Sequence, residues 1–242
     1  DKYYLVAFGK KTTIKGSLSN SLNSLLTKGN FYIRSFTLEN KKIFKQKAFN
    51  FEADLLYQNN YYKISKGKVK LGNLYFNIKG DIAKGYPKNI NLKISDGKVK
   101  LSELLPLIQN HLKAFLNTFA ISGNIYFNST ISGTLSEDSP AHIESSFFIS
   151  NGTIFNKKTK EKISNIKLKG IYTNGQQNNG NTSSINIEKF YTSAKNIKLN
   201  GKLTIQNFNS PRIQLSLDTD LDLDQTAQFI NLNSLDFLNG NL

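Results

Sequence analysis

Apolar residues at every second position, in two runs separated by a proline, are the feature that most constrains the fold. They occur in residues 197–230 (IKLNGKLTIQNFNSPRIQLSLDTDLDLDQTAQFI). Such alternation places all the apolar side chains of a strand on one face of a sheet. Pro211 lies between the runs, where its missing N–H removes no hydrogen bond from a strand ladder. Asp224 is a suitable N-cap for a helix after the second run. The segment therefore predicts two strands followed by a helix.

The same order of features occurs earlier, in residues 76–108 (FNIKGDIAKGYPKNINLKISDGKVKLSELLPLI). Gly80 corresponds to Gly201, and Pro87 corresponds to Pro211. Further upstream, TIKGSLS resembles TISGTLS, FYIRSFTL resembles FFISNGTI, and LYQNN resembles IYTNG. These matches predict two tandem units in one continuous structural domain. The units are residues 1–119, which end in a helix at 102–118, and residues 120–242, which are truncated at their helix.

The alternation predicts about sixteen short strands and only one complete helix, Ser102–Thr118, so the expected class is mainly β. Asn59-Asn60 is expected to form a hairpin turn, Lys41–Lys47 a basic turn, and residues 173–184 a mobile loop. One helix can cover only a few strands. The apolar faces must therefore pack as a sandwich of two sheets, or line a trough in one long, strongly curled antiparallel sheet.

The charge is strongly positive: 32 Lys and Arg against 17 Asp and Glu give a formal net charge of +15. Lysines on the wet face of strands commonly serve solubility and discourage edge-to-edge association. They would also attract an anionic membrane surface. Nucleic acid is not an expected partner, because the chain lacks aromatic-plus-arginine platforms and any helix-turn-helix segment. The absence of cysteine excludes disulfides and thiolate metal sites.

No enzymatic motif, metal site or cofactor site is expected. Four aspartates on one strand face, Asp218, Asp220, Asp222 and Asp224, lack the glycine and glutamate that an EF-hand loop requires. His111 and His142 have no partner at metal-ligand spacing. The chain has neither a nucleophile elbow nor a phosphate-binding loop.

Glycines recur in phase with the apolar residues, where each removes packing area from the inner face of a strand. One interpretation is that they permit bends or bulges that let the sheet coil. The other adds that the missing side chains leave room for an acyl chain along this face. The positions concerned are Gly16, Gly80, Gly133, Gly170 and Gly201.

Residues 201–230 resemble the C-terminal region of AsmA-like envelope proteins, whose pattern is a G-x-L-x-I-x-N-F-x-x-P-x-I-x-L-x-L strand pair followed by D-L-D-L and a short helix. SGNIYFNSTISG and KLSELLPLI are similar to that family as well. The resemblance implies a bridge-like lipid-transfer protein of the bacterial periplasm, with a curled β-groove and a role in phospholipid transport and outer-membrane homeostasis. It also implies an inner-membrane anchor, which we expect on a segment outside these 242 residues. Since the chain has no methionine, we expect it to be part of a longer product.

The leading hypothesis is an apolar groove that shields phospholipid acyl chains, with lysines at its rim. The alternative is a β-sandwich that binds no lipid and acts as a structural spacer or a protein-interaction module. The candidate groove residues are Ile78, Ile90, Leu92, Ile94, Phe127, Ile131, Leu199, Leu203, Ile205, Ile213, Leu215 and Leu217.

Overall fold

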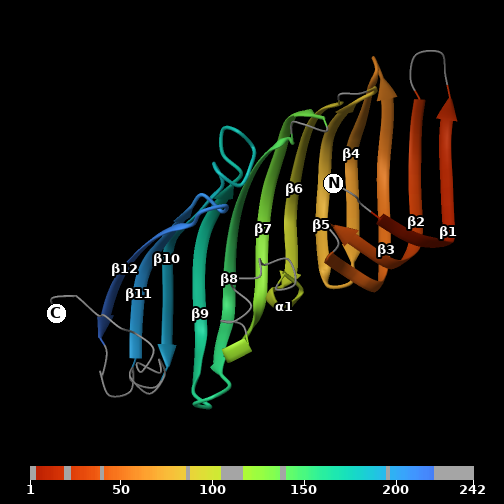
Figure 1. The fold of residues 1–242 in the computed structure, drawn as a ribbon. Helices are drawn as coiled ribbons and strands as arrows, with labels where there is room; N and C mark the ends of the chain where they lie inside the picture. Colours follow the sequence, from red (N-terminus) through yellow and green to blue (C-terminus); the bar gives the residue numbers. More distant parts are fainter. Residues whose placement is uncertain are drawn as a thin grey trace.

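The fold is a single antiparallel β-sheet in the computed structural model of the chain (Figure 1). Its backbone is described for residues 4–18, 23–38, 41–85, 88–104, 117–136, 140–194 and 197–220. Side chains are described for Gly29 and for residues 48–85, 88–104, 117–136, 140–192 and 200–218. The expected mainly β, antiparallel class is confirmed. Within these ranges the sheet has twelve strands, fewer than the sequence predicts.

The strands follow one another across the sheet in chain order, so each pairs with its neighbours in the sequence (Figure 1). The strands of the first half are β1 (Tyr4–Leu18), β2 (Asn23–Leu38), β3 (Lys41–Gln58), β4 (Tyr61–Leu71), β5 (Leu74–Ala83) and β6 (Lys88–Lys100). Those of the second half are β7 (Phe119–Leu135), β8 (His142–Asn156), β9 (Lys162–Thr173), β10 (Ser184–Ala194), β11 (Ile197–Gln206) and β12 (Arg212–Asp220).

The strands are fewer and longer than expected because several apparent breaks are β-bulges. The register shifts between Ile94 and Gly97 in β6 and between Ile149 and Gly152 in β8. Asp96 (φ 54°) and Asn151 (φ 56°) occupy these bulges in the left-handed conformation, which Asp and Asn adopt more readily than other side chains. An Asp-Gly or Asn-Gly pair that resembles a turn in the sequence therefore lies inside one continuous strand.

Neighbouring strands hold the Asp96 bulge in place. Asn77 Nδ2 donates a hydrogen bond to Asp96 Oδ2 (2.8 Å), and the Asp96 backbone N–H donates to Asn128 Oδ1 (3.1 Å). Asn77 belongs to β5 and Asn128 to β7, so the bulge is anchored from both sides. These bonds satisfy polar groups that the extra residue removes from the ladder.

Two further expectations differ from the structure. Lys41–Lys47 is not a turn, because these residues form the start of β3. Of the expected helix Ser102–Thr118, the structure describes α1 (Leu101–Leu104) and a helical turn at 117–118, and the intervening residues lie outside the described ranges. The described helix α1 packs against β6 and β7.

The strand register gives the sheet one apolar and one polar side. Directly paired residues share a side, and so do alternate residues along a strand. We define the apolar face as the side that carries the cross-strand row Gly97, Phe127, Phe147, Gly170, Ile187, Leu203 and Leu215. The polar face is the opposite side, which carries the row Lys98, Tyr126, Phe148 and Lys169.

A single layer buries little. Among the side chains described, the buried apolar residues are Leu71, Val99, Ala141 and Ile149. All twelve strands belong to the same sheet, so no second sheet faces it within the described ranges. The two-sheet core expected of a sandwich is therefore not found there.

The polar connection after β9, which its composition predicts to be a mobile loop, is joined to the neighbouring strand by hydrogen bonds. The side chain of Asn174 is 5% exposed and lies at the base of this loop. Its Nδ2 donates to the Ala141 carbonyl (2.8 Å), and its Oδ1 accepts from the Ile143 backbone N–H (2.8 Å). Thr182 Oγ1 donates to the Asn174 carbonyl (2.8 Å). The loop is thereby tied to the start of β8.

The similar sequence motifs fall on strands six apart. TIKGSLS ends β1 and TISGTLS ends β7, while Gly80 lies in β5 and Gly201 in β11. The Pro211 connection joins β11 to β12, as the connection between β5 and β6 does in the first half. The division of the chain into two similar units stays a prediction.

Asn174 should contribute measurably to stability. We expect Asn174→Ala to lower the free energy of unfolding by about 1–3 kcal/mol, because it leaves the Ile143 N–H and the Ala141 carbonyl without partners. Urea unfolding would measure the change. Gln176→Ala, at an exposed position of the same loop, is the control. Equal midpoints for the two variants would contradict this role.

Candidate functional site

The candidate groove residues come from five strands, β5, β6, β7, β11 and β12, and share the apolar face. Ile78 pairs with Ile94, and Leu92 pairs with Ile131. In the second half, the register pairs Leu203 with Leu215 and Ile205 with Ile213. Strand alternation brings Ile90, Phe127 and Leu217 to the same side. Leu199 lies in β11, outside the residues whose side chains are described.

The apolar face is more exposed on β12 than on the other strands that carry candidate residues. The candidate residues of β5, β6, β7 and β11 whose side chains are described are half-buried. In contrast, Ile213, Leu215 and Leu217 of β12 are 63%, 57% and 47% exposed. β12 has a paired neighbour on only one side among the described strands, so these side chains lack the cover that a second neighbour gives.

One polar row crosses the apolar face. Ile94 pairs with Ser129, which pairs with Ser145, which in turn pairs with Tyr172. The hydroxyls of Ser129 and Ser145 lie 2.6 Å apart and form a hydrogen bond with each other. One hydroxyl donates and the other accepts, so the row presents less polarity to an apolar ligand than two free hydroxyls would.

Aromatic rings cover several glycines of the apolar face. A Cβ atom added to Gly97 would lie 2.6 Å from the Phe127 ring, and one added to Gly170 would lie 2.8 Å from the Phe147 ring. The ring of Phe190 lies against Gly201 in the same manner. The prediction that the missing side chains leave room for an acyl chain is therefore wrong at Gly170 and Gly201, where a ring from the adjacent strand fills the space.

At Gly80 and Gly133, the backbone conformation explains why glycine is present. Gly80 (φ 137°) and Gly133 (φ 105°) adopt backbone conformations that side chains with a Cβ rarely take. A Cβ atom at Gly80 would also collide with the Asn91 carbonyl oxygen. Local bending of the strand therefore accounts for these two positions. Gly16 pairs with Leu25 in the β1–β2 ladder, and its surroundings lie outside the described side chains.

The polar face carries a stripe of aromatic rings and lysines that the hypothesis from sequence did not include. Tyr126 stacks on Phe148, with ring centroids 4.8 Å apart, and Lys98 Nζ lies 5.3 Å from the Tyr126 ring centroid. Phe148 is 49% exposed. A shallow hollow of about 640 Å³ lies beside it, lined partly by Lys169 and Tyr191.

The sequence does contain a signal for this stripe. Tyr126-Phe127 and Phe147-Phe148 are adjacent aromatic residues within strands. Because neighbouring residues of a strand point to opposite sides, one member of each pair must face outward. A pattern of apolar residues at every second position includes only the inward residue of each pair, so the outward aromatic residue is missed.

Lys169 of the polar face forms an exposed ion pair. Lys169 Nζ lies 3.5 Å from Glu188 Oε2, with side chains 69% and 41% exposed, so the pair adds little stability.

No group of three or more His, Asp or Glu residues that could hold a metal ion occurs in the described part of the chain. His142 begins β8, and its Nδ1 lies 3.1 Å from Asn178 Oδ1. Asp218 is exposed on β12, whereas His111, Asp222 and Asp224 lie outside the described ranges.

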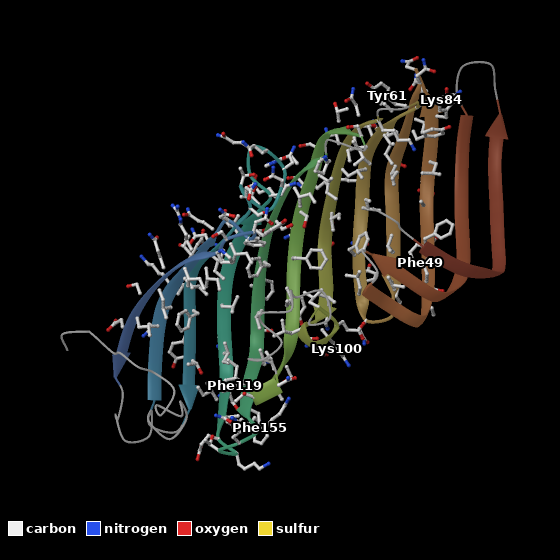
Figure 2. The ribbon with its side chains drawn as sticks, in the orientation of Figure 1. Phe49, Tyr61, Lys84, Lys100, Phe119 and Phe155 are labelled. Carbon is white, nitrogen blue, oxygen red and sulfur yellow. The ribbon has the colours of Figure 1, made fainter. Side chains whose placement is uncertain are left out.

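Aromatic and lysine side chains lie at both ends of the strands (Figure 2). Figure 2 shows Tyr61 and Lys84 at the upper end of β4 and β5, and Phe119 and Phe155 at the opposite end of the sheet, on β7 and β8. Lys100 also lies towards the lower end, where β6 leads into α1 (Figure 2).

Within the described ranges, the structure holds no apolar helix of the length needed to cross a bilayer.

Comparison with known proteins does not assign a family. The chain matches no protein-family model, and the searches of curated proteins and of solved structures found no match either. The site must therefore be judged from its own geometry and from the sequence patterns described above.

The ring that covers Gly97 makes a specific prediction. Gly97→Ala should destabilise the protein by roughly 1–3 kcal/mol, because the added methyl group overlaps the Phe127 ring. In a Phe127→Leu background the same change should cost clearly less, since the obstructing ring is gone. Urea unfolding of the four proteins of this cycle would measure both costs. Equal costs in the two backgrounds would show that the ring does not cover Gly97.

Proposed function

We propose that the chain is a segment of an AsmA-like periplasmic protein whose apolar face curls into a groove that binds phospholipid acyl chains. In this proposal the groove conducts phospholipid between the inner and outer membranes and so supports outer-membrane homeostasis. The observation that carries the proposal is the apolar face itself, which continues from strand to strand on a sheet of one layer. Large exposed apolar surfaces commonly mark interaction sites.

The chemistry of this face suits a lipid tail. Burial of each methylene group contributes about 0.8 kcal/mol without any requirement for direction. An acyl chain can therefore slide along the face without breaking a hydrogen-bond pattern. The serine pair Ser129–Ser145 does not interrupt this surface strongly, because its hydroxyls bond to each other.

Curling of the sheet towards the apolar face is the second part of the proposal. Bulges increase local twist and bend the strand that contains them. They occur in the middle of β6 and β8, and register shifts also interrupt β1 near Val6 and near Gly9. Figure 1 shows β1, β2 and β3 bending along their length. Half-buried apolar residues on an otherwise single layer agree with a surface that bends inward.

Lysines supply the proposed contact with headgroups. Exposed lysines lie at the ends of strands, where the rim of a curled groove would be: Lys84 follows β5, and Lys88 and Lys100 are the first and last residues of β6. In the curled groove, lysines near the rim would attract the phosphates of anionic lipids, an attraction that salt screens. This contact would retain lipid weakly, which suits a protein that must release its cargo.

Site-specific photocrosslinking in cells tests the proposal. A photoreactive amino acid at Leu203 should capture lipid, whereas the same group at Lys202 should capture much less. The two residues are adjacent in β11 and face opposite sides, so they form a matched pair. Phe127 and Tyr126 provide a second such pair in β7. Equal capture at both members of each pair would overturn the groove and favour a spacer or protein-interaction module.

A charge placed on the apolar face should block lipid passage without unfolding the sheet. Leu215→Asp is well suited, because Leu215 is already 57% exposed and its replacement removes little buried area. We expect transport between membranes to fall at least several-fold, since a chain must pass a desolvated carboxylate. Gln214→Asp, on the polar face of the same strand, should leave transport unchanged. Loss of transport in both variants would point to a general defect instead.

A further inference from the structure

β12 is an edge strand of the described sheet, and its pairing is regular. Its residues pair with β11 from Arg212 to Asp220 without a register shift. On the other side it has no partner among the described strands. The exposed apolar side chains Ile213, Leu215 and Leu217 follow this edge at every second position. The edge therefore offers both unpaired backbone groups and apolar area to an incoming strand.

Proteins normally protect such an edge. The usual devices are bulges, prolines and inward-pointing or edge lysines. β12 contains no lysine, proline or bulge, and its charged residues, Arg212, Asp218 and Asp220, lie towards its two ends. The uncharged, alternating stretch between them is a template for β-strand addition.

The repeat identifies the strand that fits. In the sequence repeat, β12 corresponds to β6 and β1 corresponds to β7. Within the sheet, β6 pairs with β7. β1 is the other open edge of the described sheet. A β12–β1 contact between two copies would therefore reproduce the β6–β7 junction that already exists inside the chain.

The internal junction also fixes the register of this contact. Ile90 pairs with Gly133 in the β6–β7 ladder, and these residues correspond to Ile213 and Gly16. Transfer of that register pairs each residue of β12 with one residue of β1 in antiparallel order. The resulting pairs are Ile213 with Gly16, Leu215 with Ile14 and Ser216 with Thr13. The β6–β7 ladder is interrupted by a bulge after Ile94, whereas β12 has no bulge, so straight continuation of the new ladder pairs Asp218 with Lys11. Lys11–Leu18 pairs with β2 without a shift, so this part of β1 is regular enough to serve.

Charge supports the same register independently. The register was set by the repeated glycine and apolar positions alone, yet it places Asp218 opposite Lys11. An opposite-charge pair directly across two strands stabilises their pairing, whereas a like-charge pair weakens it. Lys15 falls opposite the neutral Gln214, so these positions of β1 and β12 bring no like charges together.

We propose that β12 of one copy pairs with β1 of a second copy in this register and joins the two sheets end to end. The contact is heterologous, because each copy uses a different edge, so it leaves free edges at both ends of a dimer. Longer assemblies follow as the protein concentration rises. The apolar face continues across each junction, as it does from β6 to β7.

Engineered disulfides test the register directly, because the chain has no cysteine of its own. A Ser216→Cys copy and a Thr13→Cys copy, mixed under mild oxidation, should form a mixed disulfide rapidly. Ser17→Cys in place of Thr13→Cys is the matched control, about 13 Å along β1 from the predicted partner. Equal rates for the two mixtures, or faster disulfides between two Ser216→Cys copies, would overturn the proposal.

A charge exchange provides a second test that needs no crosslink. Asp218→Lys should shift the concentration for assembly, measured by sedimentation, upward several-fold. Adding Lys11→Asp in the same chain should restore it, because the two charges are only exchanged. A double variant as weak as the single one, or a wild-type chain that stays monomeric as its concentration rises, would overturn the proposal. Both tests are made without lipid, so their failure is distinct from failure of the lipid groove.

Discussion

Cross-strand pairing in chain order is the constraint on which the other features of this structure depend. Because every strand pairs with its sequence neighbours, the register passes from strand to strand and keeps the apolar residues on one side. Among the described residues no second sheet faces that side. The chain covers part of it with its own rings, as Phe127 covers Gly97 and Phe190 covers Gly201. Much of the remaining described apolar face is half-buried, and it is exposed at β12.

Much of this arrangement could be predicted from the sequence. The period of two is a local property, so it assigns residues such as Leu203 and Lys202 to opposite sides without any knowledge of the fold. Asn59-Asn60 forms the expected hairpin turn between β3 and β4. Their φ values of 51° and 62° are both positive, as a type I′ turn requires. The candidate site follows from the same period, because its residues share a face as soon as the strands pair.

Features that depend on neighbours could not be predicted in this way. Asp96-Gly97 resembles a hairpin turn, and its role as a bulge is apparent only when Asn77 and Asn128 are seen to hold it from both sides. The absence of a side chain at Gly201 suggests free space until the Phe190 ring is placed beside it. The loop at Asn174 likewise has the composition of a mobile segment, whereas its hydrogen bonds join it to the distant residues Ala141 and Ile143.

The strictly sequential order of the strands also affects how the sheet gains and loses structure. A strand in the middle, such as β8, is held by two ladders, whereas β1 and β12 are each held by one among the described strands. Cooperation in such an array acts mainly between nearest neighbours. Amide protons near the buried Val99 and Ile149 should therefore exchange with solvent most slowly, and those of the outer strands should exchange through openings that start at the edges. The sheet would then unzip from its ends inward, one hairpin after another, while its central strands stay folded.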